Sequence, residues 1–107
     1  MKTKVILCAA AAAALLNTGA QAADASGEAL AKNSGCFACH SVDKKLIGPG
    51  YKDIADKYRG NQGAEADLVK KVKNGTKGVW GDIPMTPNAH VKDEDIKTIV
   101  QWVLSIK

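Results

Sequence analysis

The chain has 107 residues, 46% of them hydrophobic and 24% charged, with a formal net charge of +4 at pH 7. This length corresponds to a single small domain. Positive and negative side chains are mixed along the sequence, without the strongly basic cluster that binds nucleic acid.

Residues 1–22 have the pattern of a secretory signal peptide. Two lysines precede an apolar run over residues 5–16, and Ala20 and Ala22 provide the small residues of a cleavage site. The run is too short to cross a membrane as a helix, so no stable membrane insertion is expected. We expect cleavage after Ala22, which leaves residues 23–107 as one domain exported to the bacterial periplasm.

The spacing of apolar residues predicts four helices and no strand of any length, so the expected fold class is all-α. Ser26 is a suitable N-cap for the first helix, and Gly35 is a suitable residue for its end. Three acidic residues in the first turn of the last helix complement its dipole, although the preceding Lys92 cannot cap with an oxygen. The predicted ranges are 26 to about 35, 51 to about 60, 64–74 and 93–105.

The most specific pattern is Cys36-Phe37-Ala38-Cys39-His40, directly after the first predicted helix. Two cysteines three positions apart, followed at once by a histidine, form the C-x-x-C-H motif that attaches a c-type haem. The thiols add to two vinyl groups on one edge of the porphyrin, and His40 then lies below the iron as an axial ligand. The expected cofactor is therefore one haem c, bound covalently by Cys36 and Cys39.

The loop over residues 41–50 follows this motif and contains Pro49. A carbonyl oxygen behind a ligand histidine accepts the second ring N–H, which fixes the tautomer and the orientation of the ring. Pro49 is the candidate for this role toward His40, and a plain turn proline is the alternative.

Helical spacing disappears from Thr76 to Val91, and a loop this long in so small a domain is usually functional. Near its centre, Pro84 and Pro87 stiffen the backbone around Met85. A thioether is neutral and soft enough to bind iron in both oxidation states. Met85 is therefore the candidate for the sixth iron ligand, although an isolated methionine more often fills a core.

Three other structures could use the cysteine pair. A redox dithiol of the thioredoxin type requires a strand and a βαβ pattern, and neither is visible. Structural zinc requires four ligands, and no second cysteine pair follows. A disulfide in so short a loop gains little stability. None of the three explains why His40 is adjacent to the pair or why a methionine loop follows.

The ordered set of motifs resembles a family, the small bacterial class I cytochromes c of the c-551/c-552 type, over essentially the whole mature chain. Besides the haem motif, the resemblance rests on Gly48-Pro49 with Tyr51-Lys52-Asp53, on Lys73-Asn74-Gly75, on Gly78-Val79-Trp80-Gly81, on Ile83-Pro84-Met85 with Pro87-Asn88, and on Trp102-Val103-Leu104. It implies four or five short helices wrapped around one haem, with His40 and Met85 as axial ligands.

The resemblance also implies smaller roles near the haem. Trp80 and Lys71 stand where the family has groups close to a haem propionate, and Asn88 stands where a side-chain amide supports the methionine sulphur. Core packing is the alternative for Trp80. A surface position is the alternative for Lys71, since the family often has arginine there, and lysine lacks the bidentate fork. His90 lies in a link that is one residue longer than usual, and we expect it at the surface.

The function that the resemblance implies is that of a soluble, monomeric one-electron carrier rather than an enzyme. We expect Phe37, Ile47 and Pro87 to surround the exposed haem edge, with lysines further out. The implied redox partners are a membrane cytochrome complex as donor and an oxidase, a nitrite reductase or a cytochrome c peroxidase as acceptor. The alternative class is a haem enzyme or gas sensor with a free sixth position on the iron.

Overall fold

The computed structural model describes the backbone of residues 19–107 and the side chains from Ser26 onward, so most of the predicted signal peptide lies outside the described residues. The elements are α1 (Gly19–Asn33), the short 3-10 helix η1 (Cys36–Ala38), α2 (Tyr51–Tyr58), α3 (Ala64–Asn74) and α4 (Asp93–Leu104). The described part of the chain contains two isolated β-bridges and no strand, which confirms the all-α prediction. None of its helices has both the length and the hydrophobicity needed to cross a membrane.

The first helix begins earlier than the sequence predicted. α1 starts at Gly19 and contains Ser26 in its interior, so the prediction of an N-cap at Ser26 is wrong for this chain. The reason is the alanine-rich segment before Ser26, because alanine has the highest intrinsic helix propensity and extends the helix backward. The predicted end is confirmed: α1 ends at Asn33, and Gly35 follows with a φ of 86°.

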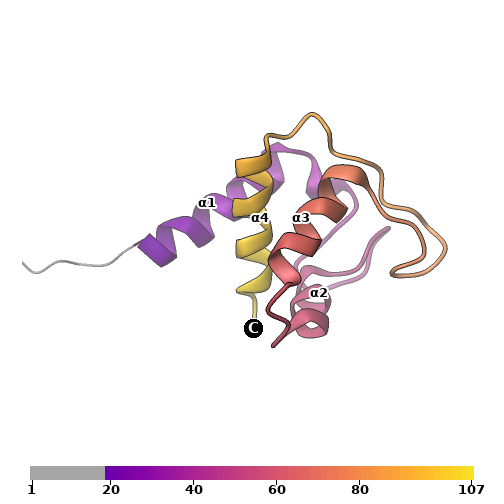
Figure 1. Ribbon diagram of the computed structural model, residues 1–107, viewed down its shortest axis with the longest axis horizontal. Helices are drawn as coiled ribbons and strands as arrows, with labels where there is room; N and C mark the ends of the chain where they lie inside the picture. Colours follow the sequence, from indigo (N-terminus) through magenta and orange to yellow (C-terminus); the bar gives the residue numbers. More distant parts are fainter. Residues whose placement is uncertain (1–18) are drawn as a thin grey trace, which may run out of the picture.

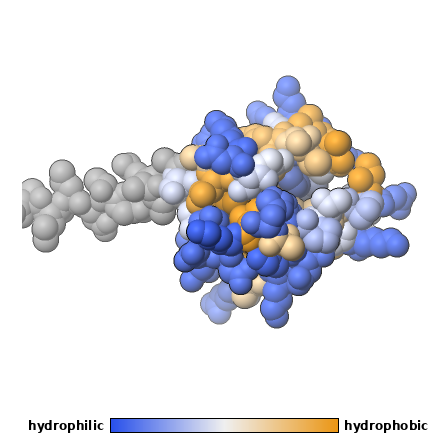
Figure 2. All heavy atoms as spheres, turned by 90° about the horizontal axis from the view of Figure 1, so that it is seen from above, coloured by the Kyte–Doolittle hydropathy of each residue, from blue (hydrophilic) through white to orange (hydrophobic). Residues whose placement is uncertain are grey.

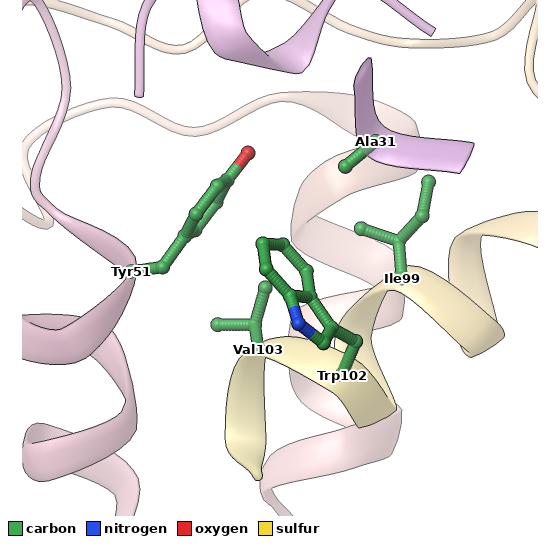
Figure 3. Packing of buried hydrophobic residues seen from close by; sticks show 5 residues of the cluster. All are labelled: Ala31, Tyr51, Ile99, Trp102 and Val103. Carbon is green, nitrogen blue, oxygen red and sulfur yellow. The ribbon is translucent and has the colours of Figure 1, made fainter. Parts of the chain in front are cut away.

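α1 and α4 cross at close range, and their contact forms the first of two hydrophobic clusters (Figure 1). A Cβ at Gly27 would overlap the Cβ of Trp102, so the two backbones approach as closely as glycine allows. Trp102 lies between Tyr51 and Ile99 in this cluster (Figure 3). Each large apolar side chain buried here contributes about 1.5–3 kcal/mol to folding. The buried members are Ala31, Tyr51, Ile99, Trp102 and Val103.

The second hydrophobic cluster joins α3 to α4. Ile96 is 0% exposed and packs with Val91 and Val100. Three apolar residues on one face of α3 pack against these three side chains; they are Leu68, Val69 and Val72. Because α4 contacts α1, α2 and α3, it is the element that holds the other helices together (Figure 1).

α4 begins without a side-chain cap, as its preceding residue Lys92 led us to expect. Lys73 near the end of α3 supplies a tie at this point. Its Nζ donates a hydrogen bond of 2.7 Å to the carbonyl oxygen of Val91 and lies 2.8 Å from Oδ1 of Asp93. The far end of the long connection between α3 and α4 is thereby tied to α3, while the middle of the connection lies on the side of α3 away from α1 (Figure 1).

Candidate haem-binding site

A cleft of about 300 Å³ opens between η1, the loop over residues 41–50 and the long connection after α3. Most of its lining is apolar. The residues predicted to attach the haem, bind its iron or support either role all line this one cleft, namely Cys36, Cys39, His40, Pro49, Lys71, Trp80, Met85 and Asn88. The fold therefore brings together residues from three separate stretches of the sequence.

The 3-10 turn η1 presents both thiols to the cleft. Cys36 is half-buried, Cys39 is exposed, and they form no disulfide. The backbone winds one full turn between them, with hydrogen bonds of 3.2 Å and 3.1 Å from the N–H groups of Cys39 and His40 to the carbonyl oxygen of Cys36. One turn of backbone places the two sulphurs within reach of the same edge of a planar group.

The imidazole of His40 is buried, at 8% exposure, and three neighbours fix its orientation. Its Nδ1 lies 2.7 Å from the carbonyl oxygen of Pro49. Since a carbonyl only accepts, Nδ1 carries the proton and Nε2 keeps its lone pair. The Tyr51 ring stacks on the imidazole with centroids 4.9 Å apart, and a Cβ at Gly48 would come within 2.7 Å of its Cε1. The ring is thus held with one nitrogen available to a metal.

Met85 is held from the backbone rather than through its side chain. Its N–H donates to the carbonyl of Thr76 at 2.9 Å, and the N–H of Thr76 donates back at 3.1 Å. Gly75 lies against this pair with a φ of 80°, and a Cβ there would come within 2.5 Å of the Met85 carbonyl oxygen. Only glycine fits both the dihedral angle and the space. The thioether of Met85 is therefore carried by a segment with a fixed position beside α3.

The chain matches known proteins over its whole length. The family model for cytochrome c matches residues 25–107. The chain is 51% identical over 107 residues to cytochrome c-551 of Pseudomonas aeruginosa, and the match covers 100% of both chains. The chain belongs to the cytochrome c family. Its cofactor is haem c, bound covalently through Cys36 and Cys39.

Two further comparisons define the branch of the cytochrome c family. Cytochrome c-552 of Nitrosomonas europaea is 48% identical over 97 residues, which is 91% of each chain. The crystal structure of wild-type Nitrosomonas europaea cytochrome c552 matches with a TM-score of 0.73 and 48% identity, over 75% of this chain and 99% of that chain. The chain is a class I cytochrome c of the c-551/c-552 type, a small electron carrier and not an enzyme.

The cleft of this cytochrome fits a haem in its chemistry. It combines two thiols one turn apart, an imidazole nitrogen with its lone pair free and a thioether, within mostly apolar walls. Apolar walls exclude water from a metal centre, and this exclusion is one of the factors that set the redox potential of the metal. One buried hydroxyl in these walls, that of Tyr51, has no hydrogen-bond partner among the described residues.

Lys71 and Trp80 both have protein partners at the edge of the cleft. Lys71 Nζ donates to Oδ2 of Asp67 at 2.6 Å, one turn earlier on α3, and this hydrogen bond raises the pKa of Lys71. Trp80 is 39% exposed, with Lys57 Nζ 5.3 Å from its ring centroid in a cation–π contact. Its exposure argues against the alternative of core packing. Contact of either side chain with a haem propionate stays a prediction.

Asn88 anchors the methionine loop to the end of α3. Its side-chain Nδ2 donates to the carbonyl oxygens of Val72 at 3.1 Å and Thr86 at 3.2 Å. Its backbone N–H donates at 3.1 Å to the carbonyls of Val72 and Lys73. The last carbonyls of a helix lack partners within the helix, so Asn88 satisfies them while it holds the loop. A hydrogen bond from its amide to the Met85 sulphur stays a prediction.

One residue expected at the haem edge lies elsewhere. Phe37 packs in the first hydrophobic cluster, with its ring centroid 5.6 Å from that of Tyr51 and 6.1 Å from that of Trp102. The prediction for Phe37 is therefore wrong, because the middle of the cysteine turn packs its side chain against the helix core instead of the open edge. Ile47 and Pro87 are exposed, and their position at the haem edge stays a prediction; His90 is at the surface, as expected.

Sequence reasoning missed three residues that shape the site. Tyr51 enters the sequence analysis only as part of the resemblance, although an aromatic residue two positions after Pro49 is a signal for a neighbour of the histidine. Gly48, beside that proline, was a similar signal for a close backbone approach. Thr76 carried no signal, because its pairing with Met85 spans a loop without periodicity.

Proposed function

We propose that this cytochrome is a soluble, monomeric carrier that works in the bacterial periplasm after removal of residues 1–22. The signal-peptide pattern supports the location, and the match of the family model begins at residue 25, just after the expected cleavage site. The observation that carries the functional proposal is the single cleft lined by the cysteine pair, His40 and Met85.

In this proposal His40 and Met85 are the two axial ligands of the iron. Pro49 holds the proton of His40 on Nδ1 and so directs Nε2 to the metal. The backbone pairing of Met85 with Thr76 keeps the thioether at the cleft. Bound haem c supplies one-electron redox chemistry, and thioether ligation with burial favours its reduced state. His40 and Met85 would both hold the iron, so no position on the metal would be open to a substrate.

The remaining cleft residues have supporting roles in the proposal. Lys71 and Trp80, at the edge of the cleft, provide hydrogen-bond donors for a haem propionate. Lys71 carries a positive charge at neutral pH, which complements an ionised carboxylate. Asn88 keeps the methionine loop, and with it the Met85 sulphur, in place against α3.

The exposed side chains near the cleft suit brief contacts with redox partners. Leu46, Ile47 and Ile83 are 50%, 53% and 62% exposed. Figure 2 shows hydrophobic residues gathered at the surface on the side away from α1, beside a hollow. Lys44 and Lys45 adjoin them in the sequence. A small apolar patch with a charged rim favours weak docking and rapid release. The proposed partners are a membrane cytochrome complex as donor and an oxidase, a nitrite reductase or a cytochrome c peroxidase as acceptor.

The axial ligand pair is tested by Met85→Ala in the haem-loaded protein. The oxidised wild type should show the weak far-red absorption of a sulphur–iron bond, and the variant should lose it and bind carbon monoxide rapidly when reduced. Ile83→Ala, in the same loop and mostly exposed, is the matched control and should keep the band. A wild type that lacks the band and binds carbon monoxide rapidly would support a sensor or peroxidase instead.

The location is tested separately by fractionation of cells and by the mass of the purified protein. We expect the protein in the periplasmic fraction, with Ala23 as its first residue. A cytoplasmic protein that retains residues 1–22 would contradict the proposal without affecting the assignment of the ligands.

A further inference from the structure

The hydroxyl of Tyr51 stands out among the buried polar groups. Tyr51 is only 4% exposed. Its hydroxyl is the only buried side-chain oxygen or nitrogen in the described part of the chain that makes no hydrogen bond. The ring cannot turn to bring the hydroxyl to water, because His40, Phe37 and Trp102 pack around it with centroids at 4.9, 5.6 and 5.1 Å. A buried hydroxyl without a partner is costly, so its position indicates an acceptor that arises when the cleft is filled.

The sulphur of Cys36 is the candidate acceptor. Tyr51 and Cys36 line the same cleft, and Cys36 packs against the cluster that contains Tyr51. Within this cluster the Tyr51 oxygen points away from Val103 (Figure 3). Their proximity also affects their acidities. Burial raises the pKa of the Cys36 thiol, and the nearby Tyr51 hydroxyl acts in the opposite direction. A tyrosine hydroxyl carries its proton at neutral pH, so Tyr51 is a hydrogen-bond donor here.

We propose that the Tyr51 hydroxyl donates a hydrogen bond to the Cys36 sulphur once that sulphur is a haem thioether, and that this bond raises the reduction potential. A free thiol carries its own proton, whereas a thioether sulphur is only an acceptor, although a weak one. A proton directed at this sulphur withdraws electron density from the porphyrin edge and so favours Fe(II) over Fe(III). Tyr51 is thus a positioning and tuning residue that acts through Cys36.

The test compares wild type, Tyr51→Phe and the control Tyr58→Phe as haem-loaded proteins. Phenylalanine keeps the stacked ring and removes only the hydroxyl. Tyr58 lies on the same helix and lines the same cleft, which makes it a matched loss of a hydroxyl. In wild type, the carbon–sulphur vibration of the thioether in resonance Raman spectra should shift when the protein is exchanged into D₂O. This shift should be absent in Tyr51→Phe and unchanged in Tyr58→Phe.

The second readout is the midpoint potential. We expect the equilibrium constant for reduction to fall about three-fold in Tyr51→Phe, which corresponds to a decrease of about 28 mV at 59 mV per tenfold. A wild type without a deuterium-sensitive thioether vibration would overturn the proposal, and this measurement needs no variant. A Tyr51→Phe protein with an unchanged potential and increased resistance to denaturant would also overturn it, because the hydroxyl would then lack any acceptor. The proposal rests on haem attachment at Cys36, which haem staining on a denaturing gel tests independently.

Discussion

Replacement of Gly48 by alanine perturbs the proposed iron ligand without touching it chemically. The added Cβ would lie 2.7 Å from Cε1, 3.1 Å from Nδ1 and 3.3 Å from Nε2 of His40, so it would press on the face of the ring. Ordinary contacts begin at 3.4 Å, and the ring would have to retreat by about 0.7 Å. The Tyr51 ring stacks on the same imidazole, and the 2.7 Å hydrogen bond to Pro49 holds its edge.

Because the ring has little freedom to move, the strain should appear in the stability of the protein. Overpacking of this kind costs about 1–3 kcal/mol. In a domain of this size, each kcal/mol lowers the melting temperature by about 4–8 °C. We therefore expect a clearly lower free energy of unfolding for Gly48→Ala, together with shifted NMR signals of the His40 ring.

The assay is equilibrium unfolding of the haem-loaded protein in guanidinium chloride, followed by circular dichroism and by haem absorption. Gly63→Ala is the control, since its Cβ would have no neighbour closer than 3.7 Å and its φ is −89°. The steric reasoning would be refuted if Gly48→Ala stayed within about 0.5 kcal/mol of wild type, the usual range for surface substitutions, with unshifted His40 signals.

Two further predictions concern the helices that carry the site. Ile96→Ala should destabilise the protein by about 2–5 kcal/mol, because Ile96 is fully buried between α3 and α4. Ile96→Val removes less volume and should cost about 0.5–1.5 kcal/mol. Equal losses of stability for the two variants in denaturant unfolding would exclude a cavity effect. Asp67→Asn should lower stability at neutral pH but not at high pH. Asp67 raises the pKa of Lys71 above its ordinary 10.5 in the folded state, so this stabilisation is complete below 10.5 and is lost as the pH rises through the raised value. Urea unfolding of wild type and Asp67→Asn from neutral to high pH measures this difference in stability. A difference that did not change with pH would refute the prediction.

Much of the fold could be predicted from the sequence because its signals are local. The predicted bounds of α3 agree with the structure to the residue. Its signals are local, because the acidic side chains lie in its first turn and Asn74-Gly75 lies at its end. The start of α1 was not, because a long alanine-rich segment offers no local signal for where a helix begins. The cysteine pair, His40 and Met85 were found from motifs whose spacing is fixed by covalent and coordination chemistry.

The sequence by itself determined the cofactor of this cytochrome, the four helices and eight of the residues that line its cleft. Only the tertiary structure decided how those residues are held: Gly48 and Tyr51 against the His40 ring, Thr76 paired with Met85, the Asn88 amide on the carbonyls that end α3, and Phe37 turned into the core. The physical reason is that each of these contacts joins groups from segments separated by a loop or a turn without periodicity. The packing of α4 against the other helices determines which of these groups meet, and no local pattern of residues predicts it.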